Sequence, residues 1–243
     1  MENKLLKGKD DVSFYERFSH ELRTALTGVL GFSEYVENSI NDPMMKFAAQ
    51  AIHNSGKEVL SMTSAYFDFL RFKSGEVKIQ LSTFNAVEVI TEVMHQVREI
   101  ANVSGIKLVL NCDGDAWAIR IVSDFALFRR MIDLVLKDFV SFANKGDLIQ
   151  IEVLRGDILD HFQIRFLIIT NVVDARRISL CHDFWKGGNY SFEKQERPGV
   201  RALFAKEFIK MLSGHCVNLF SHDKHFSIDI NFPIKFSECV TYE

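Results

Sequence analysis

FSHELRTALT, residues 18–27, is the stretch on which the interpretation of this chain depends, because it sets a histidine beside a carboxylate in an amphipathic pattern. On a helix, His20 and Thr24 are four residues apart and share one face. An imidazole can act as a phosphoryl nucleophile, and an adjacent carboxylate can fix its tautomer through the far ring nitrogen. We therefore predict that His20 accepts a phosphoryl group, that Glu21 orients the ring, and that Thr24 holds a water or a phosphoryl oxygen.

The residues around this stretch predict a helical hairpin. Apolar residues recur every three or four positions and predict a helix from about residue 12 to residue 39. Asn41-Asp42-Pro43 predicts a turn, with Asp42 as the N-cap of a second helix that runs to about residue 72 and stops at Gly75. A lone antiparallel hairpin leaves an apolar face in water, so two hairpins are expected to pair as a four-helix bundle in a homodimer.

The ten residues resemble the phospho-acceptor box of sensor histidine kinases, which usually reads FSHELRTPLT. Nine of the ten positions match, and Ala25 stands where the family usually has proline. Proline kinks a helix, so its absence predicts a straighter helix near His20. The resemblance implies that the hairpin dimerises and that His20 is the phospho-acceptor. Residues 21–24 also resemble the family's E-x-x-T phosphatase motif, in which Thr24 would orient a water.

The rest of the chain predicts an α+β fold. Alternating apolar residues predict strands over residues 77–81, 106–110, 118–122, 148–154, 162–173 and 226–234, and helical periodicity predicts helices over 84–103, 125–142 and 199–213. Helices among mostly antiparallel strands cover one face of a sheet. We divide the chain into a flexible tail (1–10), the helical hairpin (11–75), a linker strand (76–83) and an α/β sandwich (84–243). This sandwich resembles the ATPase domain of histidine kinases.

The sequence matches the ATP-binding boxes of that domain at only a few positions, which predicts a degenerate nucleotide site. Asp138 stands where the family has a Mg²⁺-binding asparagine; it has the oxygens to bind a hard cation, but we interpret it as a solvated helix residue. Asp174 keeps the acid of the D-x-G-x-G box, but Arg176 replaces its first glycine. The last box keeps Gly199, and Arg201 replaces its second glycine. Without these glycines, phosphate has few backbone N–H groups to bind, so ATP-dependent kinase activity is not expected.

The composition excludes several classes of protein. A chain of 243 residues with 47% hydrophobic residues and a net charge of −3 can build one or two real cores and carries no excess of basic residues for nucleic acid. The four cysteines lack metal-ligand spacing. No apolar run is long enough for a bilayer and the N-terminus lacks a signal-peptide core, so a cytoplasmic protein is expected. Because the acceptor stretch begins at residue 18, we expect the signal to come from a partner.

Three functions remain open. The first is a histidine phosphotransfer protein of a two-component phosphorelay, which shuttles a phosphoryl group between receiver-domain aspartates and His20 without ATP. It needs no cofactor of its own, because the receiver domain supplies Mg²⁺. The second is a pseudokinase regulator that binds and inhibits a kinase or response regulator, although the intact acceptor stretch argues against it. The third is a divergent active histidine kinase or phosphatase.

Partners are expected on the hairpin near His20. Response-regulator receiver domains, and a hybrid histidine kinase upstream of them, are the partners that a phosphorelay implies. Arg17 and Arg23 lie within a turn of His20 and can steer an acidic receiver pocket. The docking surface below His20 is predicted to use residues from both helices, namely Leu30, Tyr35, Phe67 and Leu70.

Overall fold

The computed structural model describes residues 2–73, 78–156, 160–170, 185, 200–222 and 225–236. Within these ranges, the side chains of residues 2–17, 72–73, 200 and 218–222 are outside the description. The chain divides into two compact units, Met1–Lys78 and Ile79–Glu243, and each has its own fold.

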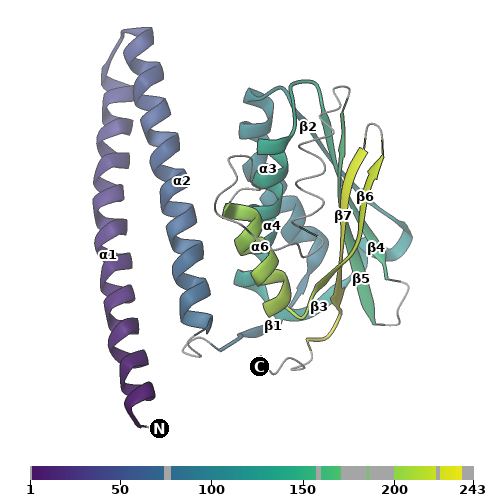
Figure 1. Cartoon of the computed structure of the whole chain (residues 1–243). Coiled ribbons are helices and arrows are strands. Elements are labelled where there is room, and N and C mark those ends of the chain that lie inside the picture. Colours follow the sequence, from purple (N-terminus) through teal and green to yellow (C-terminus); the bar gives the residue numbers. More distant parts are fainter. Residues whose placement is uncertain are drawn as a thin grey trace. The chain divides into compact units, whose positions relative to one another are not determined.

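The first unit is an antiparallel helical hairpin of α1 (Glu2–Ser39) and α2 (Pro43–Lys73), as Figure 1 shows. Asp42 caps α2 as predicted, because its Oδ1 accepts the backbone N–H groups of Met44 at 2.8 Å and Met45 at 3.1 Å. The segment predicted as a tail over residues 1–10 is helical from Glu2 onward. Residues 2–13 contain no proline, and their lysines, leucines and glutamate are good helix formers, so nothing in this segment stops the helix at residue 12.

Steps of three and four define the faces on which α1 and α2 meet. On α2 the contact face includes the small residues Ala49 and Gly56 and, further along, Phe67, and all three are buried. Phe67 packs edge to face against Phe18 of α1, with ring centroids 6.1 Å apart. Small residues on α2 and, further from the turn, the ring pair of Phe18 and Phe67 therefore hold the hairpin together.

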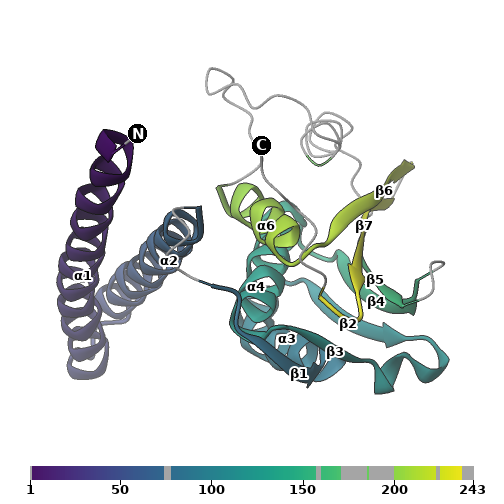
Figure 2. The ribbon, with the colours of Figure 1, turned by 90° about the horizontal axis from the view of Figure 1, so that it is seen from below.

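The second unit is an α+β sandwich, as predicted. Its main sheet has the strand order β2-β4-β5-β7-β6, in which β2 and β4 are parallel and the other neighbours are antiparallel. Its strands are β2 (Lys107–Cys112), β4 (Leu148–Arg155), β5 (His161–Ile169), β6 (His215–His222) and β7 (His225–Pro233). The helices α3 (Ala86–Val103), α4 (Phe125–Phe142) and α6 (Val200–Met211) lie on one face of this sheet (Figures 1 and 2). A short helix, η1 (Gly114–Ala118), leads into a separate ribbon of β1 (Leu81–Asn85) and β3 (Arg120–Asp124).

The core of this unit lies between the sheet and the three helices, and aromatic rings dominate it. Phe128 of α4 contacts Phe232 of β7 at 5.8 Å between ring centroids, and Phe139 of α4 contacts Phe166 of β5 at 5.7 Å. Alternate residues of β5 face this core, which is why its sequence alternates between buried and half-buried positions. Burying a phenylalanine side chain contributes about 1.5–3 kcal/mol, so these rings account for much of the stability of the unit.

Two sequence predictions for this unit are wrong. The linker strand predicted over residues 76–83 is displaced: the strand begins at Leu81 and continues to Asn85, so Phe84 and Asn85 are not part of the helix predicted from residue 84. Asn85 ends the strand and caps α3, because its Oδ1 accepts the backbone N–H of Val87 at 2.9 Å. The edge strand β6 was not predicted. It is held by backbone hydrogen bonds to β7, which leave no side-chain pattern in the sequence.

Candidate functional site

His20 lies on the exposed side of α1, away from the apolar side chains of that helix. The exposed apolar residues of α1 include Phe18, Val29 and Phe32, which share one side of the helix. His20 follows Phe18 by two residues, and each residue turns the helix by about 100°, so the imidazole points to nearly the opposite side. The ring is therefore open to solvent on a continuous helix, where a partner protein can reach it.

The structure describes the two residues near His20 that the motif singles out, Thr24 and Glu21. The Thr24 hydroxyl donates to the backbone carbonyl of His20 at 2.9 Å, so its proton is already used and only its lone pairs remain for a water or a phosphoryl group. The ring of His20 makes no hydrogen bond to Glu21 within the described structure, because consecutive helical residues point about 100° apart. The orienting role of Glu21 stays a prediction.

The predicted docking residues of α1 fall into two groups. Arg23 and Tyr35 are exposed, and the Tyr35 side chain is 69% accessible. Leu30 instead faces α2, where an added Cβ on Gly56 would lie only 2.9 Å from its Cδ2 atom. Leu30 is therefore part of the contact between the helices rather than a free docking side chain. The side chain of Arg17 lies outside the described residues.

On α2, the predicted docking residue Phe67 is 6% exposed and packs against Phe18, so its placement on a docking surface is wrong. Its position on the inward face follows from the same spacing that buries Ala49 and Gly56. Leu70 is half-buried. The sequence shows that Leu30, Tyr35, Phe67 and Leu70 are apolar or aromatic. It does not show which of them pack between α1 and α2 and which are exposed to solvent.

In the second unit, the structure brings Asp138 of α4 and Arg201 of α6 together. Asp138 is 2% exposed, so its interpretation as a solvated residue is wrong: it occupies an inward position on a helix whose other inward residues are apolar. Burial raises the pKa of Asp138 to about 7, and the positive charge of Arg201 offsets part of that rise. Its Oδ1 has no hydrogen-bond partner in the described part of the chain.

The described part of this site does not fit a divalent cation well. A carboxylate oxygen is a suitable ligand for Mg²⁺, but Asp138 lies near a guanidinium that is always charged and repels a second cation. Arg201 thus supplies, from the chain itself, the positive charge that a metal would bring. The other residues predicted for the degenerate nucleotide site, Asp174, Arg176 and Gly199, lie outside the described residues.

A polar contact between the two helices of the hairpin was missed. Ser33 is 6% exposed, and its Oγ lies 3.2 Å from Nδ1 of His53 on α2. The same Nδ1 lies 3.2 Å from the carbonyl oxygen of Leu30. The available signal was His53 itself, which stands four residues after Ala49 and three before Gly56, on the face of α2 that packs inward.

No helix in the described ranges is both long and apolar enough to cross a membrane. No protein-family model matches the chain. Its sequence is 24% identical, over 230 residues and 93% of its length, to the autoinducer 2 sensor kinase/phosphatase LuxQ of Vibrio cholerae. That alignment covers 26% of LuxQ, so the chain spans about a quarter of this relative's length.

Solved structures show the same fold. Full-length ShkA in complex with AMPPNP matches 91% of the chain and 45% of its own length, with a TM-score of 0.64 and 16% identity. The histidine kinase ThkA in complex with the response regulator protein TrrA matches 95% of the chain and 65% of that protein, with a TM-score of 0.53 and 13% identity. The chain is therefore sensor histidine kinase-like in sequence and in fold.

Proposed function

We propose that this histidine kinase-like chain is a histidine phosphotransfer protein of a two-component phosphorelay. His20 accepts a phosphoryl group from the aspartate of one receiver domain and passes it to the aspartate of another. The observation that carries the proposal is the placement of His20, exposed on α1 within a sequence that departs from the acceptor box at a single position. Phosphoryl transfer depends on in-line placement and charge neutralisation, and the partner can provide both.

The proposed reaction uses no ATP and no cofactor of this chain. Asp138, at the position of the metal-binding asparagine in the family, is buried and faces the charge of Arg201. Arg201 also replaces a glycine of the last box, where a nucleotide phosphate would need close approach to the backbone. In the phosphorelay the receiver domain supplies Mg²⁺, so losing the nucleotide site leaves the transfer step intact.

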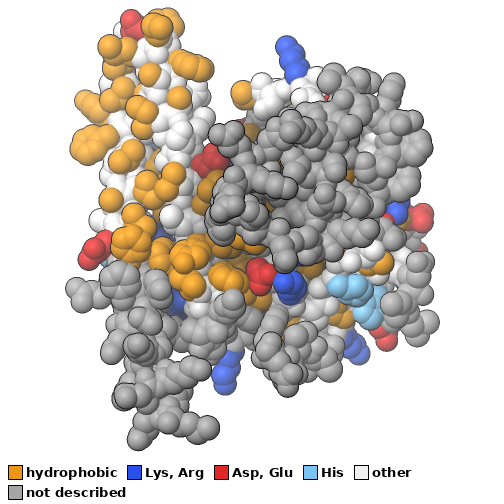
Figure 3. Space-filling model, in the orientation of Figure 1, with side chains coloured by type: hydrophobic (Ala, Val, Ile, Leu, Met, Phe, Trp, Pro, Cys, Tyr) orange, Lys and Arg blue, Asp and Glu red, His pale blue; other side chains and the backbone are white. Residues whose placement is uncertain are grey.

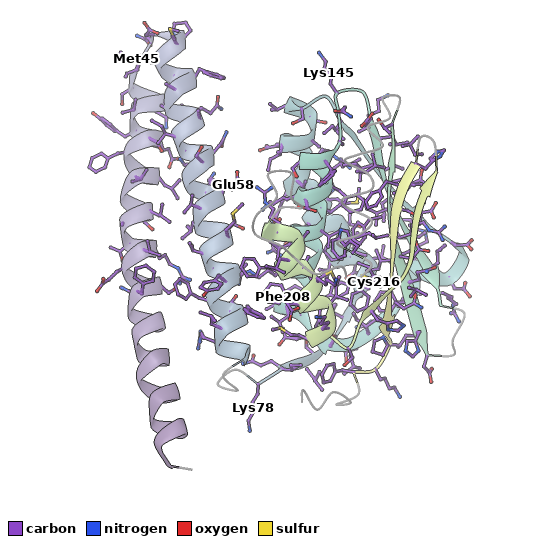
Figure 4. All side chains as sticks on the ribbon, in the orientation of Figure 1. Met45, Glu58, Lys78, Lys145, Phe208 and Cys216 are labelled. Carbon is purple, nitrogen blue, oxygen red and sulfur yellow. The ribbon has the colours of Figure 1, made fainter. Side chains whose placement is uncertain are left out.

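The proposed assembly is a homodimer through the hairpin. On α2, four apolar residues recur every seven positions, and their side chains are between 43% and 59% exposed: Met45, Ile52, Val59 and Tyr66. Figure 3 shows orange hydrophobic side chains gathered on the hairpin, and Met45 lies near its turn in Figure 4. A seven-residue apolar repeat is typical of a helical seam that packs against another helix. Because His20 points away from the apolar side of α1, this pairing leaves it open.

The proposed partners are receiver domains. ThkA, whose fold is similar, was crystallised in complex with a response regulator. On this chain, the exposed Arg23 lies one turn from His20 and offers positive charge to the acidic pocket of a receiver. A surface that combines the exposed imidazole, this arginine and Tyr35 further along α1 suits such a partner better than a small-molecule substrate.

Two other functions have observations in their favour. A divergent kinase or phosphatase is favoured by the similarity to LuxQ, which is a sensor kinase/phosphatase, and by the E-x-x-T spacing of Glu21 and Thr24. A pseudokinase regulator is favoured by the altered positions Asp138 and Arg201. The regulator needs the fold but not His20, so a test at this residue separates it from the phosphotransfer protein.

The test is a transfer assay without ATP. The protein is incubated with a phosphorylated receiver domain, next to the His20→Ala variant and to His95→Ala, which removes an exposed histidine of α3 as a matched control. We expect acid-labile, base-stable phosphate on the wild type and on His95→Ala, and none on His20→Ala. Tight receiver binding without any transfer would support the regulator instead. Labelling of the protein by the γ-phosphate of ATP would contradict the ATP-independent function.

A further inference from the structure

We propose that Leu30, Ser33 and His53 form a cross-helix lock that sets the register of α1 against α2 and thereby positions His20 for transfer. The inference about the lock comes from contacts within the hairpin alone. Its consequence for phosphoryl transfer rests on the function proposed above.

Two side-chain groups, the Ser33 hydroxyl and Nδ1 of His53, converge on the backbone oxygen of Leu30. The carbonyl of Leu30 accepts the Ser33 hydroxyl at 2.8 Å and lies 3.2 Å from Nδ1 of His53. A carbonyl can only accept, so Nδ1 carries the proton. Since the Ser33 proton is directed at Leu30, the Ser33 oxygen is left to accept from the same Nδ1–H at 3.2 Å. The network therefore assigns the tautomer of His53 and joins helices through residues that are twenty or more positions apart.

This network can specify a register where apolar contacts cannot. Ser33 is the only buried polar side chain among those described between residues 18 and 71. Apolar side chains tolerate sliding along each other, whereas a buried polar group that loses its partner costs about 1–3 kcal/mol. A shift of α1 along α2 by one turn leaves the Ser33 bond to Leu30 intact within α1, but it removes both acceptors from Nδ1 of His53, which is half-buried. Single buried polar residues fix register between packed helices in the same way.

Leu30 is held at its side chain as well as at its carbonyl. An added Cβ on Gly56 would lie 2.9 Å from Cδ2 of Leu30, so α2 offers a gap in its side chains that fits this leucine. The other glycines of the hairpin differ, because an added Cβ on Gly28 or Gly31 meets nothing within 4 Å. The glycine opposite Leu30 therefore leaves room for this side chain, next to the histidine that binds the carbonyl of the same residue.

The lock can act on His20 through the helix. Leu30 lies ten residues after His20, which is about 15 Å along the axis of α1. Both residues belong to one continuous helix without proline, so α1 transmits an axial shift or rotation at Leu30 to His20. In-line transfer is sensitive to such displacement, because a misplacement of about 1 Å can slow an enzymatic step about 100-fold.

The test separates positioning from stability. Single-turnover transfer from a phosphorylated receiver is measured at rising receiver concentration for His53→Leu, which removes the donor, and for His53→Asn, which keeps an N–H near the place of Nδ1. We expect His53→Leu to lower the saturated rate about tenfold or more while the half-saturating concentration changes less than about threefold. His53→Asn should recover most of the rate.

Ala49→Gly is the matched control, because it weakens the same face of α2 without removing a hydrogen bond between the helices. The lock is overturned if Ala49→Gly, at an equal loss of hairpin stability, slows the saturated rate as much as His53→Leu does. It is also overturned if His53→Leu changes only the half-saturating concentration, since that outcome reflects docking rather than placement of His20.

A second measurement keeps the lock testable if no receiver transfers phosphate to the wild type, which would contradict the proposed function. Hydrogen exchange of α1 amides in the full chain gives the local opening equilibrium of Ser33→Ala, His53→Leu and the double variant. We expect the two substitutions to be non-additive by about fivefold or more. Simple additivity would overturn the lock. Both Gly56→Ala and Gly31→Ala gain the helix propensity of alanine, so Gly56→Ala should give more opening than Gly31→Ala, because only Gly56 faces Leu30.

Discussion

Asp138 is an acidic residue at a buried position of α4, where the other inward residues are apolar. It lies on the inward face of α4, and burial holds the pKa of its carboxyl near 7 although Arg201 is close. At neutral pH a large fraction of this group is charged, inside a helix that packs against the sheet and lies beside α6. This residue is therefore a point at which the second unit loses stability as the carboxyl ionises.

Asp138→Asn removes this titration without changing the shape of the side chain. The folded state raises the pKa from 3.8 to about 7, so it binds the proton more tightly than the unfolded chain does. The resulting stabilisation is complete below about pH 4 and is lost as the pH rises through 7. Three pKa units correspond to at most about 4 kcal/mol, so the advantage of Asp138→Asn should grow by up to that amount between pH 4 and pH 8.

Denaturant unfolding of the full chain at several pH values checks this prediction. Tryptophan fluorescence follows the second unit selectively, because both tryptophans, Trp117 and Trp185, lie in it. Asp115→Asn, at a carboxylate that is 87% exposed, is the control and should change the unfolding free energy by less than about 0.5 kcal/mol. A difference between wild type and Asp138→Asn that stays constant with pH would contradict the assignment.

At the scale of elements, one arginine links three neighbouring strands of the main sheet. Arg165 of β5 binds the two carboxylate oxygens of Asp229 on β7 at 2.7 and 2.8 Å, and it contacts Glu152 of β4 at 3.2 Å. The strand register sets these three residues directly opposite each other. Asp229 is 2% exposed, so its charge depends on this partner. A shifted register of these strands would lose this charged pairing.

Arg165→Met should strongly destabilise the second unit. Asp229 is buried but the Arg165 side chain is 36% exposed, so water replaces part of the lost partner and the cost should be about 2–3 kcal/mol, below that of a fully buried pair. Arg155→Met is the matched control on β4, because Arg155 meets Asp115 only at 3.9 Å and both side chains are largely exposed. Its cost should stay below about 1 kcal/mol. Denaturant unfolding measures both losses. Equal losses for the two variants would show that the ion pairs of Arg165 stabilise the second unit no more than an exposed ion pair does.

At the scale of the whole molecule, the hairpin carries an apolar surface that its own fold does not cover. The exposed seven-residue repeat of α2 lies beside the face that packs against α1. In the proposed dimer, α2 therefore contacts α1 with one face and the second hairpin with the other. Phe47 is also exposed, but it follows Met45 by two residues and points to nearly the opposite side of α2. The two sides of this helix thus offer a test of the proposed dimer within one element.

Ile52→Glu should convert the dimer to a monomer, because it places a charge in the middle of the apolar repeat, where association would have to desolvate it. Phe47→Glu introduces the same charge at an exposed site outside the repeat and should leave the dimer intact. Sedimentation velocity of the full chain at several concentrations distinguishes the two. A wild type that stays monomeric, or dissociation by Phe47→Glu alone, would contradict pairing through this surface.

Much of the molecule was predictable from local patterns in the sequence. The helical spacing around residues 18–27, the Asp42 cap and the alternation of β5 each depend on near neighbours, so the hairpin and the α+β class follow from the sequence alone. The exposed position of His20 on α1 belongs to the same kind of information. Periodicity marks one side of α1 as apolar, and His20 lies on the other.

Tertiary structure decided what depends on residues far apart in the chain. The sequence shows Asp138 as a polar helix residue, and only the packing of α6 buries it beside Arg201. Similarly, the spacing on α2 indicates that His53 faces inward, but only the packing of α1 against α2 places the carbonyl of Leu30 at 3.2 Å from its Nδ1. Burial and partnership of a polar group are set by which elements pack together. The spacing of residues close together in the sequence does not show which elements pack against each other.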